Sequence, residues 1–155
     1  MPAGWHIAQV NVARMRAPHT DPIMAGFFTR VAIIEALADQ SPGFVWRLHS
    51  PAGDEHLLQV FGDPLLSINM TVWETIEALF EFTYHSAHVE PYRMRREWFE
   101  KPDIPVYALW WVRAGTRPSP EEGKARLDLI QRIGPSSAAF TFKERYDPDS
   151  SLVSL

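Results

Sequence analysis

Two histidines stand three residues apart in the stretch TYHSAHVEPYRMRREWFE, residues 83–100. On a continuous helix, His85 and His88 would share one face and could hold a metal ion or a haem. Pro91 lacks an N–H and clashes with the carbonyl one turn upstream, so we expect a break just before it. Glu90 is the one carboxylate close by. Proton transfer inside a pocket and packing or capping at a helix end are the alternatives that this spacing leaves open.

Two asparagines lie inside otherwise apolar segments, where a buried amide needs hydrogen-bond partners. Asn69 and Trp73 fall on one face of a predicted strand, and Asn11 lies on another strand. The pattern favours a pocket, with a backbone bulge as the alternative explanation. Arg93 could reach a substrate carboxylate. We interpret Arg47 as a residue on an exposed face, with an anion clamp as the alternative.

The elements that must position these residues follow from hydrophobic periodicity and from capping and breaking residues. Asp21 and Pro22 suit the start of a helix, and SPEE at 119–122 is typical of a capping box with Ser119 and Glu122. The pattern predicts strands at 5–13, 44–50, 65–73, 104–115 and 138–144, a short extended piece at 56–64, and helices at 22–38, 74–85, 91–100 and 120–133.

This order is β-α-β-β-α-β followed by an extra α-β, which is a ferredoxin-like α+β plan. Helices would cover one face of the sheet, yet the segment VYALWWV is apolar on both faces. Because too few helices remain for a second layer, we expect another copy of the sheet to cover the other face, in a homodimer. We expect one domain over residues 1–146 and a flexible tail over 147–155.

The composition of the chain argues against some classes of binding partner. The chain has 155 residues, 46% of them hydrophobic, and a net charge of −4. It contains no basic stripe that would bind nucleic acid and no Lys/Arg-rich amphipathic segment that would bind a membrane surface. We expect a cytoplasmic protein. The absence of cysteine excludes disulfides, thiolate nucleophiles and Cys-based zinc sites.

The motifs WHIAQVNVARMRAP, SPGFVWRL, NMTVWETIEAL, RREWFEKP, LWWVRAGTRPSPEE and GPSSAAFTF resemble an uncharacterised bacterial family. That family is grouped with the antibiotic-biosynthesis-monooxygenase-like dimeric α+β barrels. The resemblance implies a barrel formed by two copies, with a pocket between sheet and helices lined by Asn and Trp. The superfamily includes cofactor-free oxygenases of aromatic polyketides and haem proteins. Aligned on TVW, the helical Trp of haem-degrading members falls on Phe82 and their His near Tyr92, so this chain departs from their pattern.

The leading hypothesis is a homodimeric, cofactor-free, monooxygenase-like oxidoreductase for an apolar, aromatic or polycyclic small molecule. The predicted catalytic residues are Asn11, Asn69, His88 and His85. The predicted substrate-binding residues are Trp73, Tyr84, Arg93 and Trp98, and no metal ligands are predicted. A haem protein with His85 or His88 as axial ligand and a non-catalytic ligand-binding module are the alternatives.

Overall fold

The computed structural model describes residues 3–49, 53–85 and 95–148. Its centre is a four-stranded antiparallel sheet in the order β2-β3-β1-β4. The strands are β1 (Trp5–Arg14), β2 (Phe44–Arg47), β3 (Leu66–Trp73) and β4 (Tyr107–Arg113). The order is that of the ferredoxin-like plan, so the α+β prediction is confirmed.

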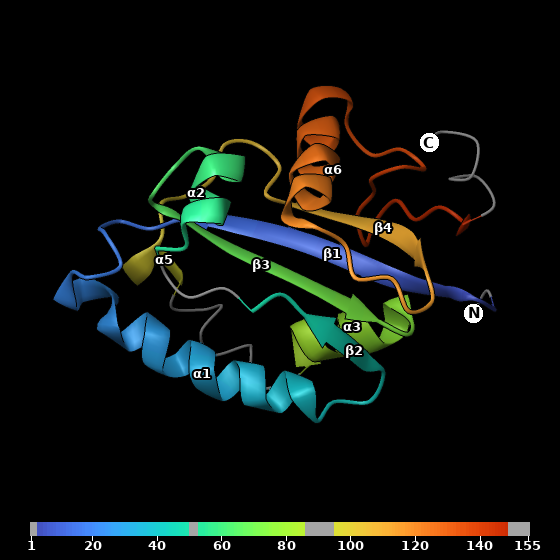
Figure 1. Cartoon of the computed structure of the whole chain (residues 1–155), viewed down its shortest axis with the longest axis horizontal. Coiled ribbons are helices and arrows are strands. Elements are labelled where there is room, and N and C mark those ends of the chain that lie inside the picture. The colour runs from blue at the N-terminus through green and yellow to red at the C-terminus, as the bar shows by residue number, and fades with distance from the viewer. Residues whose placement is uncertain (1–2, 50–52, 86–94, 149–155) are drawn as a thin grey trace.

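Helices lie on both sides of this sheet (Figure 1). One side carries α2 (Glu55–Phe61) and α6 (Pro120–Ile133), and the other carries α1 (Ala25–Asp39) and α3 (Ile76–His85). The 3-10 helix η1 (Pro22–Met24) precedes α1, and the short α5 (Arg95–Trp98) precedes β4. The described part of the chain contains no helix of the length and hydropathy that crossing a bilayer requires.

The premise of the dimer prediction is wrong, because the second face of the sheet is covered by the chain itself. Val10, Met70 and Trp110 point to that face and are at most 1% exposed. They pack against Leu57 of α2 and Ile130 of α6. The apolar character of both strand faces is therefore explained within one copy, and the homodimeric barrel stays a prediction.

The helix α2 replaces the extended piece that we expected at 56–64. Asp54 caps its start by accepting a hydrogen bond from the Leu57 N–H at 3.0 Å. Gly62 ends it in the left-handed conformation, with φ of 76°, and donates its N–H to the Leu58 carbonyl. Glycine adopts this conformation without the strain that a Cβ would bring, so the chain can leave the helix after Phe61.

Two details at the C-terminal part also differ from the expectation. The predicted last strand at 138–144 is reduced to a bridge in which Phe140 and Leu109 exchange two backbone hydrogen bonds. Ser119 caps α6 as predicted, but Glu122 does not reach back to it. The Glu122 carboxylate instead accepts a hydrogen bond from the Trp110 indole at 3.0 Å, so it ties α6 to the sheet.

Candidate functional site

A cavity of about 860 Å³ opens between the sheet and the helices α1 and α3. Phe27, Val31 and Ile34 line it from α1, and Leu79 and Phe82 line it from α3. Its size lies within the range of small-molecule sites, which are mostly apolar with a few convergent polar groups. The walls therefore suit an apolar ligand.

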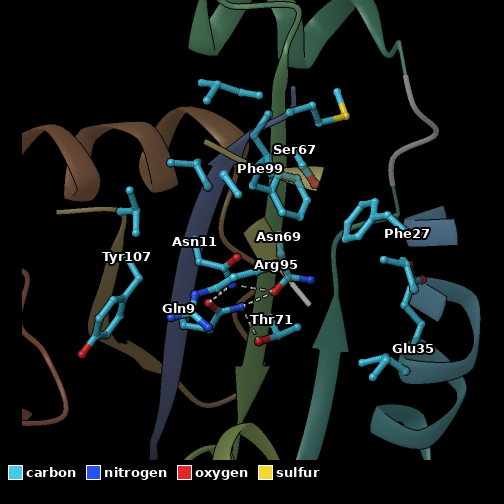
Figure 2. Close-up of a pocket in the computed structure, with 18 of the residues that line it drawn as sticks. Gln9, Asn11, Phe27, Glu35, Ser67, Asn69, Thr71, Arg95, Phe99 and Tyr107 are labelled. Carbon is cyan, nitrogen blue, oxygen red and sulfur yellow. Dashed lines mark hydrogen bonds between the residues drawn. The ribbon is translucent and has the colours of Figure 1, made fainter. Parts of the chain in front are cut away.

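A row of polar side chains crosses the floor of this cavity (Figure 2). Gln9 and Asn11 of β1 stand directly opposite Thr71 and Asn69 of β3 in the antiparallel register. Because side chains alternate across a strand, all four share the face that looks toward α1 and α3. We call Gln9, Asn11, Asn69 and Thr71 the amide row.

The amide row is internally hydrogen-bonded. Gln9 Nε2 donates to Asn69 Oδ1 at 2.6 Å and to Thr71 Oγ1 at 2.8 Å. Asn11 Nδ2 donates to Gln9 Oε1 at 2.9 Å and to Asn69 Oδ1 at 3.1 Å. The Trp73 indole N–H donates to Thr71 Oγ1 at 2.9 Å and anchors the end of the row. These bonds offset the cost of placing amides on an apolar floor and fix their orientation.

Burial is graded along the row. Trp73 is 1% exposed, and Gln9 and Thr71 are each 6% exposed. Asn11 is half-buried and Asn69 is exposed, and both line the cavity. The two asparagines are therefore the members that a ligand can contact most readily, with Gln9 and Thr71 behind them.

Arg47 is buried rather than on an exposed face, and it does not serve as a free anion clamp. Its guanidinium donates to Asp39 Oδ1 at 2.8 Å and to the Glu35 carbonyl at 2.9 Å, and it lies 3.1 Å from Glu35 Oε2. The ion pairs join β2 to the C-terminal half of α1. Arg47 therefore holds one wall of the cavity in place.

The cavity also reaches the carboxyl of Asp63. Burial raises the pKa of this carboxyl, but the hydrogen bonds from the Leu65 N–H and the Arg14 guanidinium outweigh burial and hold the pKa below its usual range. Asp63 is thus a carboxylate at neutral pH. Its charge is engaged by Arg14, which also pairs with Glu100.

The structure brings together four of the residues predicted for the site. Asn11, Asn69, Trp73 and Tyr84 all line the cavity. Trp98 instead packs against Phe27 in a buried cluster at the start of α1, and its neighbour Phe99 lines the cavity. Trp98 points away because α5 turns its indole toward α1.

Of the two histidines of the sequence motif, only His85 lies within the described residues, and it is not in the cavity wall. His85 is exposed at the end of α3, with its ring 6.1 Å from that of Phe80, and is not among the lining residues. His88, Arg93 and the expected break before Pro91 lie outside the described residues. Of the histidines that are described, only His19 lines the cavity.

Gln9 and Thr71 are the site residues that sequence reasoning missed. The signal was present, because Gln9 lies two residues before Asn11 and Thr71 lies midway between Asn69 and Trp73. The hydrogen bonds between the two strands could not be found without the register. Arg95 and Tyr107 also line the cavity and lacked any distinguishing pattern in the sequence.

A metal or haem site finds little support in these residues. Within residues 3–49, 53–85 and 95–148, no three His, Cys, Asp or Glu side chains are grouped as metal ligands. His85 does not fit as an axial ligand for a haem in this cavity, because its ring packs on Phe80 outside the lining.

Several solved structures are similar to the chain. The chain is similar to the crystal structure of SnoaB, a cofactor-independent oxygenase from Streptomyces nogalater, with 17% identity, a TM-score of 0.46 and coverage of 74% of this chain and 98% of that one. It is also similar to a putative antibiotic biosynthesis monooxygenase from Nitrosomonas europaea, with 14% identity, a TM-score of 0.47 and coverage of 77% and 98%.

A third similar structure is a putative antibiotic biosynthesis monooxygenase from Chloroflexus aurantiacus, with 12% identity, a TM-score of 0.45 and coverage of 74% and 97%. None of the curated proteins compared matches the chain. The family model described as a domain of unknown function, DUF3291, matches residues 6–154, as the resemblance to an uncharacterised family predicted. The chain therefore belongs to the DUF3291 family.

Proposed function

We propose that this protein binds an apolar, aromatic or polycyclic metabolite in the cavity and oxygenates it without a cofactor. The observation that carries the proposal is the amide row on the floor of an otherwise apolar cavity. Polar groups on an apolar wall cost stability unless they are hydrogen-bonded, and here the bonded amides converge where a ligand would lie. Amide N–H groups suit an oxygen atom that gains negative charge.

The reaction that fits is oxidation of a CH₂ group that is attached to a carbonyl carbon or conjugated with it through an aromatic ring. Loss of a proton from that carbon gives an enolate, whose oxygen accepts a hydrogen bond from Asn69. The enolate passes one electron to O₂, and the two radicals combine to form a carbon–oxygen bond. The resulting hydroperoxide loses water and leaves a ketone, so that CH₂ and O₂ become C=O and H₂O. The electrons come from the substrate itself.

Two features of the cavity support enolate formation. The asparagines offer hydrogen-bonding groups that are already oriented, so little reorganisation is needed as charge develops. Arg95 lines the same cavity and adds a positive charge, which favours an anion more strongly in an apolar site than in water (Figure 2).

Histidine is the side chain best suited to accept the proton near neutral pH. His88 keeps the role that the sequence suggested, and its position lies outside the described residues. His19 is the described imidazole that lines the cavity, and it joins His88 as a candidate base. His85 is the weaker candidate because its ring lies outside the lining.

Oxygen uptake tests the proposal. Purified protein is mixed with an anthrone, a tricyclic ketone with an acidic CH₂, and O₂ consumption is followed with an electrode alongside quinone absorbance. We expect uptake of one O₂ per ketone formed. We also expect at least a tenfold slower rate for Asn69→Leu, since loss of one stabilising donor in such sites lowers the rate by about 10²–10³. Binding with no uptake across a panel of such ketones and hydroquinones would remove the oxygenase proposal.

The second candidate is a ligand-binding module without catalysis. The observation that favours it is that the amide row is neutral: no described acid or base is hydrogen-bonded to it. This candidate predicts that aromatic ligands bind with a stable dissociation constant in air. It also predicts that no product forms over hours.

A homodimer also belongs to the proposal. Helix α1 supports it, since Ile33 and Leu37 are large apolar residues that are 58% and 39% exposed on its outer surface. Sedimentation equilibrium at micromolar concentration tests it directly. A stable monomer of 17.7 kDa would contradict the dimer and leave the proposed cavity chemistry untouched.

A further inference from the structure

We propose that the amide row selects a ligand edge that carries a hydrogen-bond acceptor and a hydrogen-bond donor side by side, and that Gln9 is the residue that sets this selectivity. The inference rests on the proposed binding of an aromatic ligand in the cavity. It adds the chemical class of that ligand and a positioning residue that the sequence motifs do not reveal.

The selectivity follows from counting hydrogens and lone pairs. An amide offers two N–H hydrogens and one oxygen with two lone pairs. Asn69 Oδ1 accepts from both Gln9 and Asn11, which uses both of its lone pairs. Both hydrogens of Asn11 Nδ2 are used as well, on Gln9 Oε1 and Asn69 Oδ1.

The donor and the acceptor that the row does not use face the cavity, where the proposed ligand would lie. Among the described residues, Asn69 Nδ2 donates to no protein group and Asn11 Oδ1 accepts from none. Both residues line the cavity, where Asn69 is exposed and Asn11 is half-buried. The floor therefore presents one donor and one acceptor on neighbouring strands.

This result does not depend on which way the amides are turned. If Asn69 alone were reversed, its N–H groups would face the N–H groups of Gln9 and Asn11, which is repulsive. Only a concerted reversal of all three amides keeps every bond. That reversal exchanges the two asparagines' roles and still leaves one donor and one acceptor toward the cavity.

Gln9 is what couples the two asparagines. It is 6% exposed, both of its N–H hydrogens are used, and it contacts Asn11, Asn69 and Thr71. Thr71 in turn accepts from the buried Trp73 indole, which anchors Gln9 from the far side. Gln9 is therefore a positioning residue that acts through the two asparagines.

The complementary ligand is an aromatic molecule with C=O beside N–H or O–H on one edge. Two chemistries share this pattern, a lactam and a hydroxy-ketone. The probes are 2-quinolinone for the lactam and 2-hydroxy-1-tetralone for the hydroxy-ketone. Each has a partner in which methylation removes the donor, N-methyl-2-quinolinone and 2-methoxy-1-tetralone.

Titration calorimetry on the full chain measures the four dissociation constants. For at least one chemistry, we expect the free edge to bind about tenfold more tightly than its methylated partner, the value of one net hydrogen bond. The pair with the larger ratio identifies which chemistry the site prefers. Equal affinities within both pairs would overturn the inference while leaving binding of aromatics intact. No binding of any probe would overturn the proposed function as well.

Variants at Gln9 test its role separately from the fold. Gln9→Leu removes the bonds that Gln9 makes with each asparagine, so that only the 3.1 Å bond between Asn11 and Asn69 still orients them. We expect the ratio between free and methylated edges to fall below about threefold, with less change in the affinity for the methylated probes, which rests on apolar contact. The matched control is Gln59→Leu on the exposed side of α2, which should keep the ratio of the wild-type chain.

Gln9→Glu gives a prediction that a purely structural role would not make. At pH 8.5 a carboxylate only accepts, so we expect Asn69 to turn its N–H groups toward residue 9 and its oxygen toward the cavity, giving up the longer 3.1 Å bond from Asn11. The site then presents two acceptors, and preference should move from 2-quinolinone to 2,3-dihydroxynaphthalene, whose edge has two donors. If Gln9→Glu folds and keeps the wild-type preference, or if Gln9→Leu keeps the wild-type ratio, Gln9 does not set the selectivity.

Discussion

The two faces of the sheet use the same strands for opposite purposes. On β1 and β3, the residues Val10 and Met70 are fully buried under α2 and α6. Their immediate neighbours Asn11 and Asn69 lie on the cavity floor under α1 and α3. Alternation of side chains along a strand lets a single pair of strands support a dry core and present a polar site.

The helices that cover the two faces differ in the same way. Helix α6 buries Leu127 and Ile130 on the packed face. Helix α1 is one residue longer and apolar along most of its length, yet Ala38 is its only buried residue. The face with the candidate site is therefore under-packed, and a ligand of the proposed kind would gain its contacts in the space between α1 and the sheet.

Substitutions at neighbouring positions of β3 should separate the two faces most clearly. Met70→Ala is expected to lower the free energy of unfolding by about 2–5 kcal/mol, because it leaves a hole in a closed core. Asn69→Ala should cost less than about 1 kcal/mol, since the two donors it leaves behind can reach solvent in the cavity. Urea unfolding of both variants measures the difference. Equal losses would show that the cavity floor is packed as tightly as the core.

The fold was largely predictable because its signals are local. The apolar runs of the strands and the caps at Ser119 and Asp21 were found in the sequence. Helix α2 was missed although Asp54 and Gly62 are typical helix boundaries, because the short apolar run between them also fits a strand. Because α2 was missed, the predicted fold had one covering helix too few. This led to the wrong premise that a second copy must cover the other face of the sheet.

Residues of the candidate site were predictable only where their side chain was unusual for the surrounding sequence. Asn11 and Asn69 were found because amides are rare in apolar strands. Gln9 and Thr71 gave no comparable signal, since their importance lies in pairing across the register of β1 and β3. Trp98 was predicted to line the pocket together with Trp73, but the direction of its side chain depends on how α5 meets α1.

The anchor of the amide row offers a test of its energetic coupling. Thr71→Val keeps the shape and removes the acceptor of the buried Trp73 indole, so we expect a loss of about 1–3 kcal/mol in the free energy of unfolding. Trp73→Phe removes the donor instead. The double variant should lose less than the sum of the single variants, because the indole N–H that Thr71→Val leaves without an acceptor is then absent, while the Gln9 N–H loses its acceptor in both Thr71 variants alike. Additive losses in a double-mutant cycle would show that the bond has no coupling energy.

Substitutions on the covering helices α1 and α6 should also differ in their effect on the free energy of unfolding. Ile34→Ala on the cavity side of α1 should cost less than about 1 kcal/mol, because Ile34 is only half-buried and lines open space. Ile130→Ala on α6, where the side chain is 1% exposed, is the reference and should cost about 2–5 kcal/mol. Thermal unfolding in the presence of a bound probe sharpens the comparison, since a ligand that fills the cavity should raise the cost of Ile34→Ala.

The smallest effect is expected at the ion pair between Asp63 and Arg14, at the edge of the cavity. The pKa of Asp63 is held below its usual range, so the carboxylate stabilises the fold above the unfolded-state pKa of about 3.9. This contribution is lost as the pH falls through the lower pKa of the folded state. Because the pair is partly exposed, Asp63→Asn should cost only about 0.2–1 kcal/mol at pH 7, and less in 1 M salt.

The pH dependence of that difference identifies its origin. The gap in unfolding free energy between the wild-type chain and Asp63→Asn should be constant from pH 7 to about pH 5 and should shrink below about pH 4, where the unfolded carboxyl begins to bind its proton. Glu81→Gln on the exposed side of α3, whose carboxyl has no ion-pair partner within the described residues, serves as the control and should show no such gap. A gap that widens toward low pH would mean that the carboxyl is destabilising in the fold, so that burial rather than Arg14 and the Leu65 N–H governs this edge of the cavity.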